Sequence, residues 1–470
     1  MNPRLPSGFV LGASTAAYQI EGAVTEDGRG PSIWDTFCAE PGRILDNSSG
    51  DPACDHYHRL DEDLGLMREL GLQGYRFSIA WPRVLPRGRG DVNAAGLDFY
   101  DRLVDGLLQA GIAPMATLYH WDLPQALQDE GGWSARSTVD AFEEYAAVVA
   151  GRLADRVSYW CPVNEPNVVT VLGHALGMHA PGKTDLFGAL PVIHHLMLGH
   201  GRAVRALREA GAAAVGTATN HATVWVKGDT DADRAGAAAY DTLWNRLVAD
   251  PVLLGRYPEE YAGLMPVENG DLELISAPLD FYGVNYYSPV LVGAPGRNAE
   301  GTSDDAADVG GDPGGGSAVP TGLAGLPFSF HPIRGVPTTD FGWPVVPAGL
   351  SDLLVELTER YPGLPPLHVT ENGCSYNTGP DDSGEVHDDA RVEFLDRHLE
   401  AVADAIARGV DVRGYWTWSL LDNFEWAEGY TQRFGLVHVD FATQRRTPKA
   451  SFHWYRDLIR AHSESPQARA

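Results

Sequence analysis

Two glutamates stand at chemically informative positions in this 470-residue sequence. Glu165 ends an apolar run in the motif VNEP, and Glu371 ends another in VTENG. Either carboxylate alone is well explained as the ion-pair partner of an arginine such as Arg76. Cleaving a glycosidic bond, however, needs one carboxylic acid that protonates the leaving oxygen and a second carboxylate across the sugar ring. The two motifs together therefore favour glycoside hydrolysis, with Glu165 and Glu371 as the candidate catalytic residues.

Polar and aromatic side chains gather beside these glutamates and at the ends of other apolar runs. The candidate binding and supporting residues are Gln19, Arg76, His120, Trp121, Asn164, Asn285, Tyr287, Trp343, Trp418, Glu425 and Trp426. Sugars present apolar faces that stack on aromatic rings, and hydroxyl groups that bond to amide, imidazole and carboxylate side chains. A single tryptophan or histidine is usually part of a core, but this many polar groups are costly to bury unless they are paired or used. The set therefore predicts a carbohydrate site.

Eight short apolar runs, typical of buried strands, alternate with amphipathic stretches typical of helices. The predicted strands are residues 8–18, 74–81, 113–121, 157–165, 213–221, 281–288, 367–372 and 412–420. The predicted helices include residues 96–110, 138–154, 191–210, 234–248, 350–361 and 388–408. Eight such repeats favour an α/β fold with a closed (β/α)8 barrel, whose strands direct their carboxyl ends to one face. An open doubly wound sheet is the alternative, but GASTAAYQIEG after the first strand lacks the expected G-x-G-x-x-G turn.

One segment interrupts this alternation. Residues 293–341 are rich in Gly, Pro, Asp and Ser, with DVGGDPGGGS near the centre. Because the segment follows the sixth strand, we expect it to border the mouth of the barrel, and its Gly-rich centre, residues 309–317, to be mobile. The sequence has no linker that separates two domains. It therefore predicts one catalytic domain over residues 1–470, with this long loop as an insertion.

The charge balance excludes several classes of partner. Lys and Arg number 35 against 63 Asp and Glu, which gives a formal net charge of −28. Nucleic acids and anionic membranes both select basic surfaces, so neither is expected as a partner. The chain has no apolar run of about 20 residues and its start does not resemble a signal peptide, so we expect a cytoplasmic protein. The four cysteines lack metal-ligand spacing, and two carboxylates suffice for hydrolysis, so no metal or other cofactor is expected.

The motifs, taken in order, resemble those of the family 1 glycoside hydrolases, the β-glucosidase family, over nearly the whole chain. The matching segments are FVLGASTAAYQIEGA, ACDHYHR, YRFSIAWPR, LYHWDLPQAL, VNEP, DFYGVNYYS, VTENG and WSLLDNFEWAEGYTQRFGLVHVD. Each segment is modestly specific, whereas the ordered set is highly specific. The resemblance implies a (β/α)8 barrel and a retaining β-glucosidase of bacterial type. It would act on terminal β-D-glucosyl residues of cello-oligosaccharides and of aryl or alkyl glucosides.

The resemblance also implies a role for each candidate residue. Glu165 matches the acid/base and Glu371 matches the nucleophile. The residues that match those holding the sugar at the cleavage site are Gln19, His120, Asn164, Glu425 and Trp426. Trp418 matches the stacking platform for the sugar, and Trp343 matches an aromatic residue of the leaving-group site. Asn285, Tyr287 and Arg76 match the residues that position the nucleophile and the 2-hydroxyl side of the sugar. Trp121 is assigned to the aromatic platform from its position alone.

The chain departs from the family at one position. The family usually has Thr two residues before the Asn of T-x-N-E-P, and this chain has Pro162. Proline cannot donate to a sheet ladder, and it lacks a hydroxyl that could support the acid/base. Because both carboxylates and Asn164 remain, we expect an altered pH optimum rather than a loss of activity.

Several related activities are disfavoured or remain open. Relatives that act on 6-phosphorylated sugars carry Ser and a nearby Lys where this chain has Glu425, and a carboxylate there would repel a phosphate dianion. Glu165 disfavours the plant thioglucosidases, which have Gln at that position, and the intact pair of glutamates disfavours a sugar-binding barrel without catalysis. The sequence leaves open a preference for galactose or fucose, transglycosylation in place of hydrolysis, and assembly into a homo-oligomer.

Overall fold

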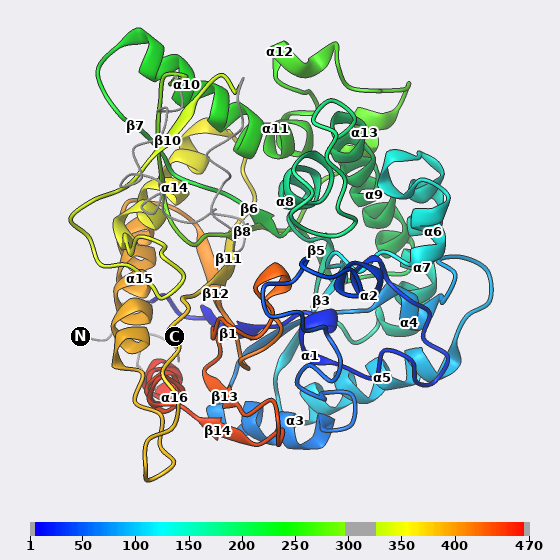
Figure 1. The fold of residues 1–470 in the computed structure, drawn as a ribbon, viewed down its shortest axis with the longest axis vertical. Helices are drawn as coiled ribbons and strands as arrows, with labels where there is room; N and C mark the ends of the chain where they lie inside the picture. The colour runs from blue at the N-terminus through cyan, green and yellow to red at the C-terminus, as the bar shows by residue number, and fades with distance from the viewer. Residues whose placement is uncertain (1–4, 297–325, 465–470) are drawn as a thin grey trace.

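A ring of parallel strands forms the centre of the molecule (Figure 1). The computed structural model describes residues 5–296 and 326–464. The ring contains β1 (Val10–Ser14), β2 (Gly74–Ser78), β3 (Ala113–Tyr119), β4 (Tyr159–Val163), β5 (Ala214–Val215), β6 (Thr219–Asn220), β8 (Tyr282–Asn285), β11 (Leu367–Asn372) and β12 (Val412–Trp418). Neighbours pair in this order except for β5 and β6, which follow one another along the chain, and β12 returns to pair with β1. The ring confirms the predicted (β/α)8 barrel.

The fifth strand of the ring is interrupted, whereas the sequence predicts one strand over residues 213–221. β5 pairs with β4 and β6 pairs with β8, so the two short strands together close the ring. The residues between β5 and β6 still form backbone hydrogen bonds with the neighbouring β4 segment. Gly216 N donates to Trp160 O (2.9 Å), and Glu165 N donates to Ala218 O (2.8 Å). The break is therefore local. Asn220, at the end of β6, lies within hydrogen-bond distance of Glu165.

Long helices surround the ring and bury their apolar stripes against it (Figure 1). They are α3 (Leu60–Leu70), α5 (Ala94–Gln109), α7 (Ser137–Leu153), α9 (Leu190–Glu209), α11 (Leu247–Leu254), α14 (Pro347–Arg360), α15 (Asp389–Ala407) and α16 (Ala450–Glu464). Five of the six predicted helices are confirmed with small shifts at their ends. The sixth prediction, residues 234–248, is wrong as one helix, because the chain forms α10 (Asp231–Asp241), a π-helical turn η3 (Thr242–Arg246) and then α11. In this turn Asn245 bonds to both backbone groups of Ala222.

Shorter elements connect the strands and helices. The short helices are α1 (Ala17–Ile20), α2 (Ile33–Cys38), α4 (Trp81–Val84), α6 (Gln125–Asp129), α8 (Pro166–Val168), α12 (Glu259–Ala262), α13 (Asp271–Ile275), η1 (Gly132–Ser134), η2 (Val169–Ala175) and η4 (Trp426–Glu428). The small sheets contain β7 (Val224–Val226), β9 (Val290–Gly293) and β10 (Ser329–His331), and the hairpin β13 (Val437–Val439) and β14 (Arg446–Pro448). The Gly-rich centre predicted to be mobile, residues 309–317, lies outside the described residues.

The interior of the barrel is filled at its base by one large side chain. Trp416 of β12 is fully buried and packs with Met115 and Cys161. Gly12 and Gly74 leave room for it, because a Cβ at Gly12 would lie 2.5 Å from the Trp416 ring. Side chains alternate between the two faces of a strand, so residues two positions further along face the same interior. This places Arg76 and Trp418 one layer above the plug, towards the carboxyl ends of the strands.

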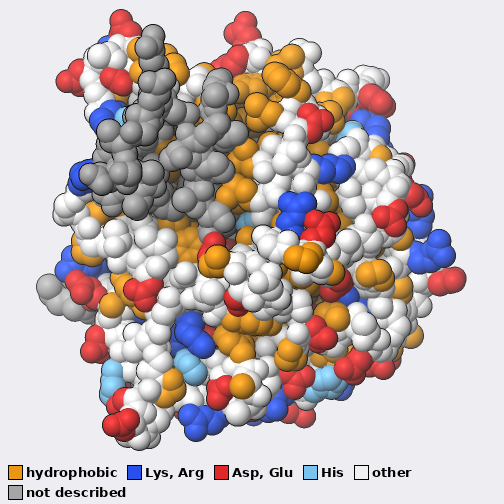
Figure 2. All heavy atoms as spheres, in the orientation of Figure 1, with side chains coloured by type: hydrophobic (Ala, Val, Ile, Leu, Met, Phe, Trp, Pro, Cys, Tyr) orange, Lys and Arg blue, Asp and Glu red, His pale blue; other side chains and the backbone are white. Residues whose placement is uncertain are grey.

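Acidic and basic side chains are interspersed over the face shown in Figure 2. Many arginines are held in ion pairs with the surplus acids, as where Arg156 contacts Asp101 (2.7 Å) and Asp105 (2.8 Å). Surface pairs of this kind add little stability each. Within residues 5–296 and 326–464, every helix is too short or too polar to cross a membrane.

Candidate active site

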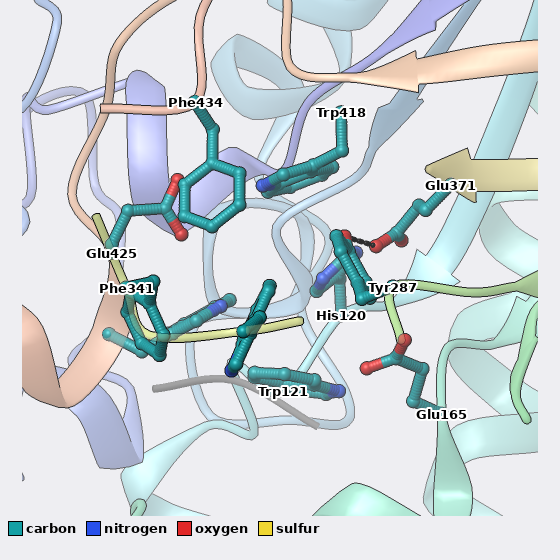
Figure 3. A pocket seen from close by; sticks show the side chains of 11 residues that line it. His120, Trp121, Glu165, Tyr287, Phe341, Glu371, Trp418, Glu425 and Phe434 are labelled. Carbon is teal, nitrogen blue, oxygen red and sulfur yellow. Dashed lines mark hydrogen bonds between the residues drawn. The ribbon is translucent and has the colours of Figure 1, made fainter. Parts of the chain in front are cut away.

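A cavity opens at the carboxyl ends of the barrel strands, where most of the predicted site residues meet. It encloses about 440 Å³ of empty space, part of it open to solvent. The residues that line it are His120, Trp121, Glu165, Tyr287, Phe341, Trp343, Glu371, Trp418, Glu425, Trp426 and Phe434. Figure 3 shows the two predicted catalytic carboxyl groups on one side of the cavity and Glu425 on the other.

Glu371, at the end of β11, is held by two donors. Its Oε1 accepts a bond from Nη1 of Arg76, and its Oε2 accepts one from the Tyr287 hydroxyl at 2.8 Å. Arg76 is fully buried, and its Nε also donates to the Thr117 hydroxyl at 3.0 Å. The guanidinium beside Glu371 confirms the predicted ion pair, and an adjacent cation favours the ionised carboxylate. Glu371 therefore has a fixed orientation beside a buried cation.

Glu165, which follows β4, has a different environment. Burial, together with the nearby negative charge of Glu371, raises its pKa to about 8. Its Oε1 accepts bonds from Nδ2 of Asn285 (2.7 Å) and Nδ2 of Asn220 (3.1 Å), and these partly oppose the rise. Pro162 is buried in β4 and has no hydroxyl group that could support Glu165. The amides of Asn285 and Asn220 supply the side-chain donors instead. At neutral pH Glu165 is therefore mostly protonated, while its neighbour Glu371 has the contacts of an anion.

A chain of amides joins the two glutamates and sets the state of His120. Asn164 Oδ1 accepts from Arg76 Nη2 (2.6 Å) and from Asn285 Nδ2 (3.1 Å), so Asn164 Nδ2 must donate to His120 Nε2 (3.1 Å). Burial and the charge of Arg76 lower the pKa of His120 well below its usual value. The imidazole is therefore neutral, with its proton on Nδ1. That buried N–H has no partner among the described residues, which makes it a donor for a ligand hydroxyl.

Further unused polar atoms belong to Glu425, on the opposite side of the cavity, and to Gln19, which bonds to Glu425. Gln19 Nε2 donates to Asn423 Oδ1 (3.0 Å), Phe424 O (2.9 Å) and Glu425 Oε2 (3.3 Å). Gln19 Oε1 and Glu425 Oε1 are buried without a hydrogen-bond partner in the described part of the chain. Burial raises the pKa of Glu425 to about 8. Because buried polar atoms are normally satisfied, these oxygens are fitted to receive hydroxyl groups of a ligand.

Aromatic rings form the remaining walls of the cavity. Trp121 lies 4.5 Å from Trp426 between ring centroids, and Trp343 lies 5.1 Å from Tyr287. The backbones of Trp121 (φ 78°), Glu165 (φ 49°) and Trp426 (φ 50°) are left-handed, a costly conformation for such residues. Strained backbones of this kind are concentrated at functional sites, where they aim particular side chains. Here all three side chains point into one cavity.

The structure sorts the predicted site residues into two groups. Four of them do not line the cavity, but each bonds to a residue that does: Arg76 to Glu371, Asn164 to His120, Asn285 to Glu165, and Gln19 to Glu425. The predicted border formed by the insertion is supported at its described end, because Phe341 lines the cavity. Across the described residues, no group of three or more His, Cys, Asp or Glu is arranged to hold a metal ion.

Sequence reasoning missed Phe341, Phe434 and Asn220. Phe341 precedes the DFGWP tryptophan, and its place in the insertion was the available signal. Phe434 lies in the loop after β12. Its ring contacts the rings of Phe341 and Trp343 at centroid distances of 6.1 and 5.7 Å. Asn220 ends β6, so its place at a strand end was a signal of the same kind as that of Asn164 and Asn285.

Comparisons with known proteins agree with this geometry. The family model described as Glycosyl hydrolase family 1 matches residues 1–464. Beta-glucosidase A of Acetivibrio thermocellus is 43% identical, covering 97% of this chain and 98% of the relative. A bifunctional beta-D-glucosidase/beta-D-fucosidase of Bifidobacterium breve is 45% identical, with the same two shares. The crystal structure of a psychrophilic beta-glucosidase from Micrococcus antarcticus matches with a TM-score of 0.91 and 46% identity, covering 97% of this chain and 98% of that one. The barrel, the paired glutamates and these matches together show that the chain belongs to glycosyl hydrolase family 1.

Proposed function

We propose that this chain is a retaining β-glucosidase that hydrolyses terminal, non-reducing β-D-glucosyl residues of cello-oligosaccharides and of aryl or alkyl glucosides. The observation that carries the proposal is the contrast between the two glutamates in one cavity. Glu371 has the contacts of a stable anion, and Glu165 has a pKa of about 8. A carboxyl group paired with a cation, beside a second one that is kept protonated, is what a two-step displacement requires.

In the first step Glu371 attacks the anomeric carbon. Glu165 gives its proton to the glycosidic oxygen, so the bond to the leaving group breaks and the alcohol departs. The product is a glucosyl ester of Glu371, in which that side chain has lost its charge. In the second step Glu165, now ionised, takes a proton from water, and the oxygen of that water attacks the anomeric carbon. Glu371 leaves as a carboxylate, and β-glucose is released.

The other predicted residues hold the sugar between these groups. His120 Nδ1 supplies a donor, and Gln19 Oε1 and Glu425 Oε1 supply acceptors for hydroxyls of the non-reducing sugar. Asn164 orients His120. The stacking surfaces come from Trp121, Trp418 and Trp426, with Trp343 on the leaving-group side. Asn285, Tyr287 and Arg76 hold the two catalytic carboxyl groups, and through them the side of the ring that carries the 2-hydroxyl.

The name of one relative supports a second sugar preference. The bifunctional protein from Bifidobacterium breve is described as both a β-D-glucosidase and a β-D-fucosidase. Fucosides are therefore included as alternative substrates of the same site, and a preference for galactosides stays open. Transglycosylation, which uses a sugar hydroxyl in place of water in the second step, requires no additional residue. A phosphorylated sugar remains disfavoured, because the carboxyl group of Glu425 lines the cavity at the position where relatives that act on phosphorylated sugars carry Ser and a nearby Lys.

A panel of nitrophenyl glycosides tests the substrate class. We expect the β-glucoside to be cleaved, with less activity on the α-glucoside and the 6-phosphoglucoside. Proton NMR during the first minutes should show β-glucose as the first product. α-Glucose as the first product would refute the retaining mechanism, and so would a carboxyl separation of about 6.5–9.5 Å instead of about 5–5.5 Å in a crystal structure. Glu371→Gln is the control for contaminating activity, since it should abolish turnover.

A further inference from the structure

Asn220 contacts Glu165 but has no role in the two catalytic steps. It ends β6, the second part of the interrupted strand, and it is 1% exposed. Its Nδ2 donates to Glu165 Oε1 at 3.1 Å, next to the bond from Asn285 Nδ2 at 2.7 Å. Two donors therefore meet on one oxygen of the carboxyl group. The other oxygen, Oε2, is left as the atom that can carry and transfer the proton.

The orientation of the Asn220 amide is determined by Trp244. The Trp244 indole donates from Nε1 to Asn220 Oδ1 at 3.0 Å. An indole nitrogen can only donate, so Oδ1 must be the atom that faces it, and Nδ2 must face Glu165. Asn167 ties the two residues together, because its Nδ2 donates to the backbone oxygens of Asn220 (3.0 Å) and of Trp244 (3.1 Å). All three side chains are buried.

Trp244 is in turn supported from the small sheet beside the barrel. It lies in the π-helical turn η3, and its ring stacks on Tyr240 at a centroid distance of 6.0 Å and an interplanar angle of 10°. The Tyr240 ring meets Phe328 at 5.3 Å and Phe330 at 5.1 Å. Phe330 belongs to β10, which lies within the long insertion of residues 293–341. π-Helical turns occur frequently at functional sites. This one contains Trp244, whose indole reaches Asn220.

We propose that Asn220 is a positioning residue for Glu165, with its amide held in the donating orientation by Trp244 and Asn167. The inference rests on the proposed function, in which Glu165 is the acid/base. Asn220 keeps Oε1 occupied and so directs the proton to Oε2. It also stabilises the carboxylate that must form before water is activated in the second step.

The proposal has a defined pH signature. The charged or titratable groups that face Glu165 are Glu371 from β11, Arg76 from β2 and Tyr287 after β8. Loss of the Asn220 donor leaves these groups in place and removes one interaction that favours the ionised form of Glu165. The Glu165 pKa therefore rises. Since Glu165 must be protonated in the first step, the alkaline limb of kcat/KM should move to higher pH by about 0.5–1, because a hydrogen bond to the ionised carboxyl group is stronger than one to the neutral group by about 1 kcal/mol.

Two variants test this in the full-length protein. Asn220→Ala removes the donor, and Trp244→Phe keeps the stacking on Tyr240 but removes the bond that orients the amide. Both should move the alkaline limb upward, the second by less. The control is Asn245→Ala, a buried amide of the same π-helical turn that bonds to Ala222 and not to Glu165. It should leave the limb in place, whatever it does to the melting temperature.

The readouts separate this proposal from the proposed function. The pKa of Glu165 is also measured directly by NMR titration of ¹³C-labelled glutamate, which does not require turnover. An inactive wild-type protein would refute the proposed function, while the NMR titration would still decide whether Asn220 acts on Glu165. Folded Asn220→Ala and Trp244→Phe proteins with an unchanged Glu165 pKa would overturn the positioning role. If Asn220→Ala fails to fold, Trp244→Phe alone decides.

Discussion

Neutralising Glu371 should lower the pKa of Glu165, because the two carboxyl groups share one cavity. The substitution Glu371→Gln keeps the shape of the side chain and removes its negative charge, as formation of the glycosyl ester does. Burial and the charge of Glu371, in that order, raise the Glu165 pKa to about 8 in the free protein. The substitution removes the second cause and leaves the first. It also leaves Arg76 without its anionic partner, so that the guanidinium favours ionised Glu165 more strongly.

The size of the effect follows from the charges and their surroundings. Two unit charges about 5.5 Å apart, the separation in retaining enzymes, interact by about 3 kcal/mol at an effective dielectric constant of about 20. This corresponds to roughly two pH units. We therefore expect the Glu165 pKa to fall from about 8 to about 6, still above the ordinary value because Glu165 remains buried. Glu165 would then be mostly protonated at pH 7 in the free enzyme and mostly ionised in the intermediate.

The assay is an NMR titration of protein labelled with ¹³C at the glutamate carboxyl carbons. The double variant Glu371→Gln, Glu165→Gln identifies the Glu165 signal by its disappearance. Glu425→Gln is the matched control, since it replaces a buried carboxyl group on the opposite side of the cavity by a neutral amide and should change the Glu165 pKa much less. A Glu165 pKa that is unchanged or higher in Glu371→Gln would refute the argument that the charge of Glu371 keeps Glu165 protonated.

Four further outcomes are expected. With azide present, Glu165→Ala should release β-glucosyl azide and Glu371→Gly the α-anomer, as NMR of the products will show, and the same anomer from both would reverse our assignment of roles. Glu165→Ala should also slow substrates with poor leaving groups by about 10²–10⁴-fold while sparing the first step on dinitrophenyl glucosides, and an equal loss on both would contradict its role as general acid. Glu425→Ala should reduce kcat/KM for β-glucosides by about 10–100-fold through loss of an acceptor for sugar hydroxyls, and unchanged kinetics would exclude that contact. Asp63→Asn should destabilise the fold by about 3–5 kcal/mol in urea unfolding because it leaves Arg446 buried without its anion, and a loss below about 1 kcal/mol would show that the pair contributes little.

The Asp63 pair also has a pH signature in the unmodified protein. Burial alone would raise the pKa of Asp63, but hydrogen bonds and charges from His56 and Arg446 lower it below its ordinary value. A carboxylate with a depressed pKa adds stability above its unfolded-state pKa, and that stability is lost as the pH falls through the folded-state pKa. The melting temperature should therefore decline below about pH 4. In Asp63→Asn this part of the decline should be absent.

Much of the site was predictable because parallel strands bring their carboxyl ends to one rim. Glu165 and Glu371 each end an apolar run, and a barrel necessarily places such positions around one mouth. The same reasoning located His120, Trp121 and Trp418, and the structure confirms that all of them line the cavity. The six amphipathic patterns were equally local signals, and five of them correspond to single helices.

The missed features depend on contacts between distant parts of the chain. Residues 213–221 have a continuous strand pattern, but the fifth strand is interrupted. Its first part pairs with β4 and its second part with β8, and these pairings between distant segments are not visible in the local sequence. The sequence pattern over 234–248 contains no mark of the π-helical turn in which Asn245 reaches the Ala222 backbone. Phe434 enters the cavity through packing on Phe341 and Trp343, which come from another loop. Side-chain packing of this kind has no local periodicity.

The order and types of residues by themselves determined the barrel, the family resemblance and the two candidate carboxylates, because strand periodicity and short motifs are local properties. Only the tertiary structure decided the states of those groups. The proton on His120 Nδ1 follows from a chain that runs through Arg76 and Asn164, and the high pKa of Glu165 follows from burial beside Glu371. Protonation depends on solvent exclusion and on charges a few ångströms away. Those distances exist only after segments separated by hundreds of residues have packed together.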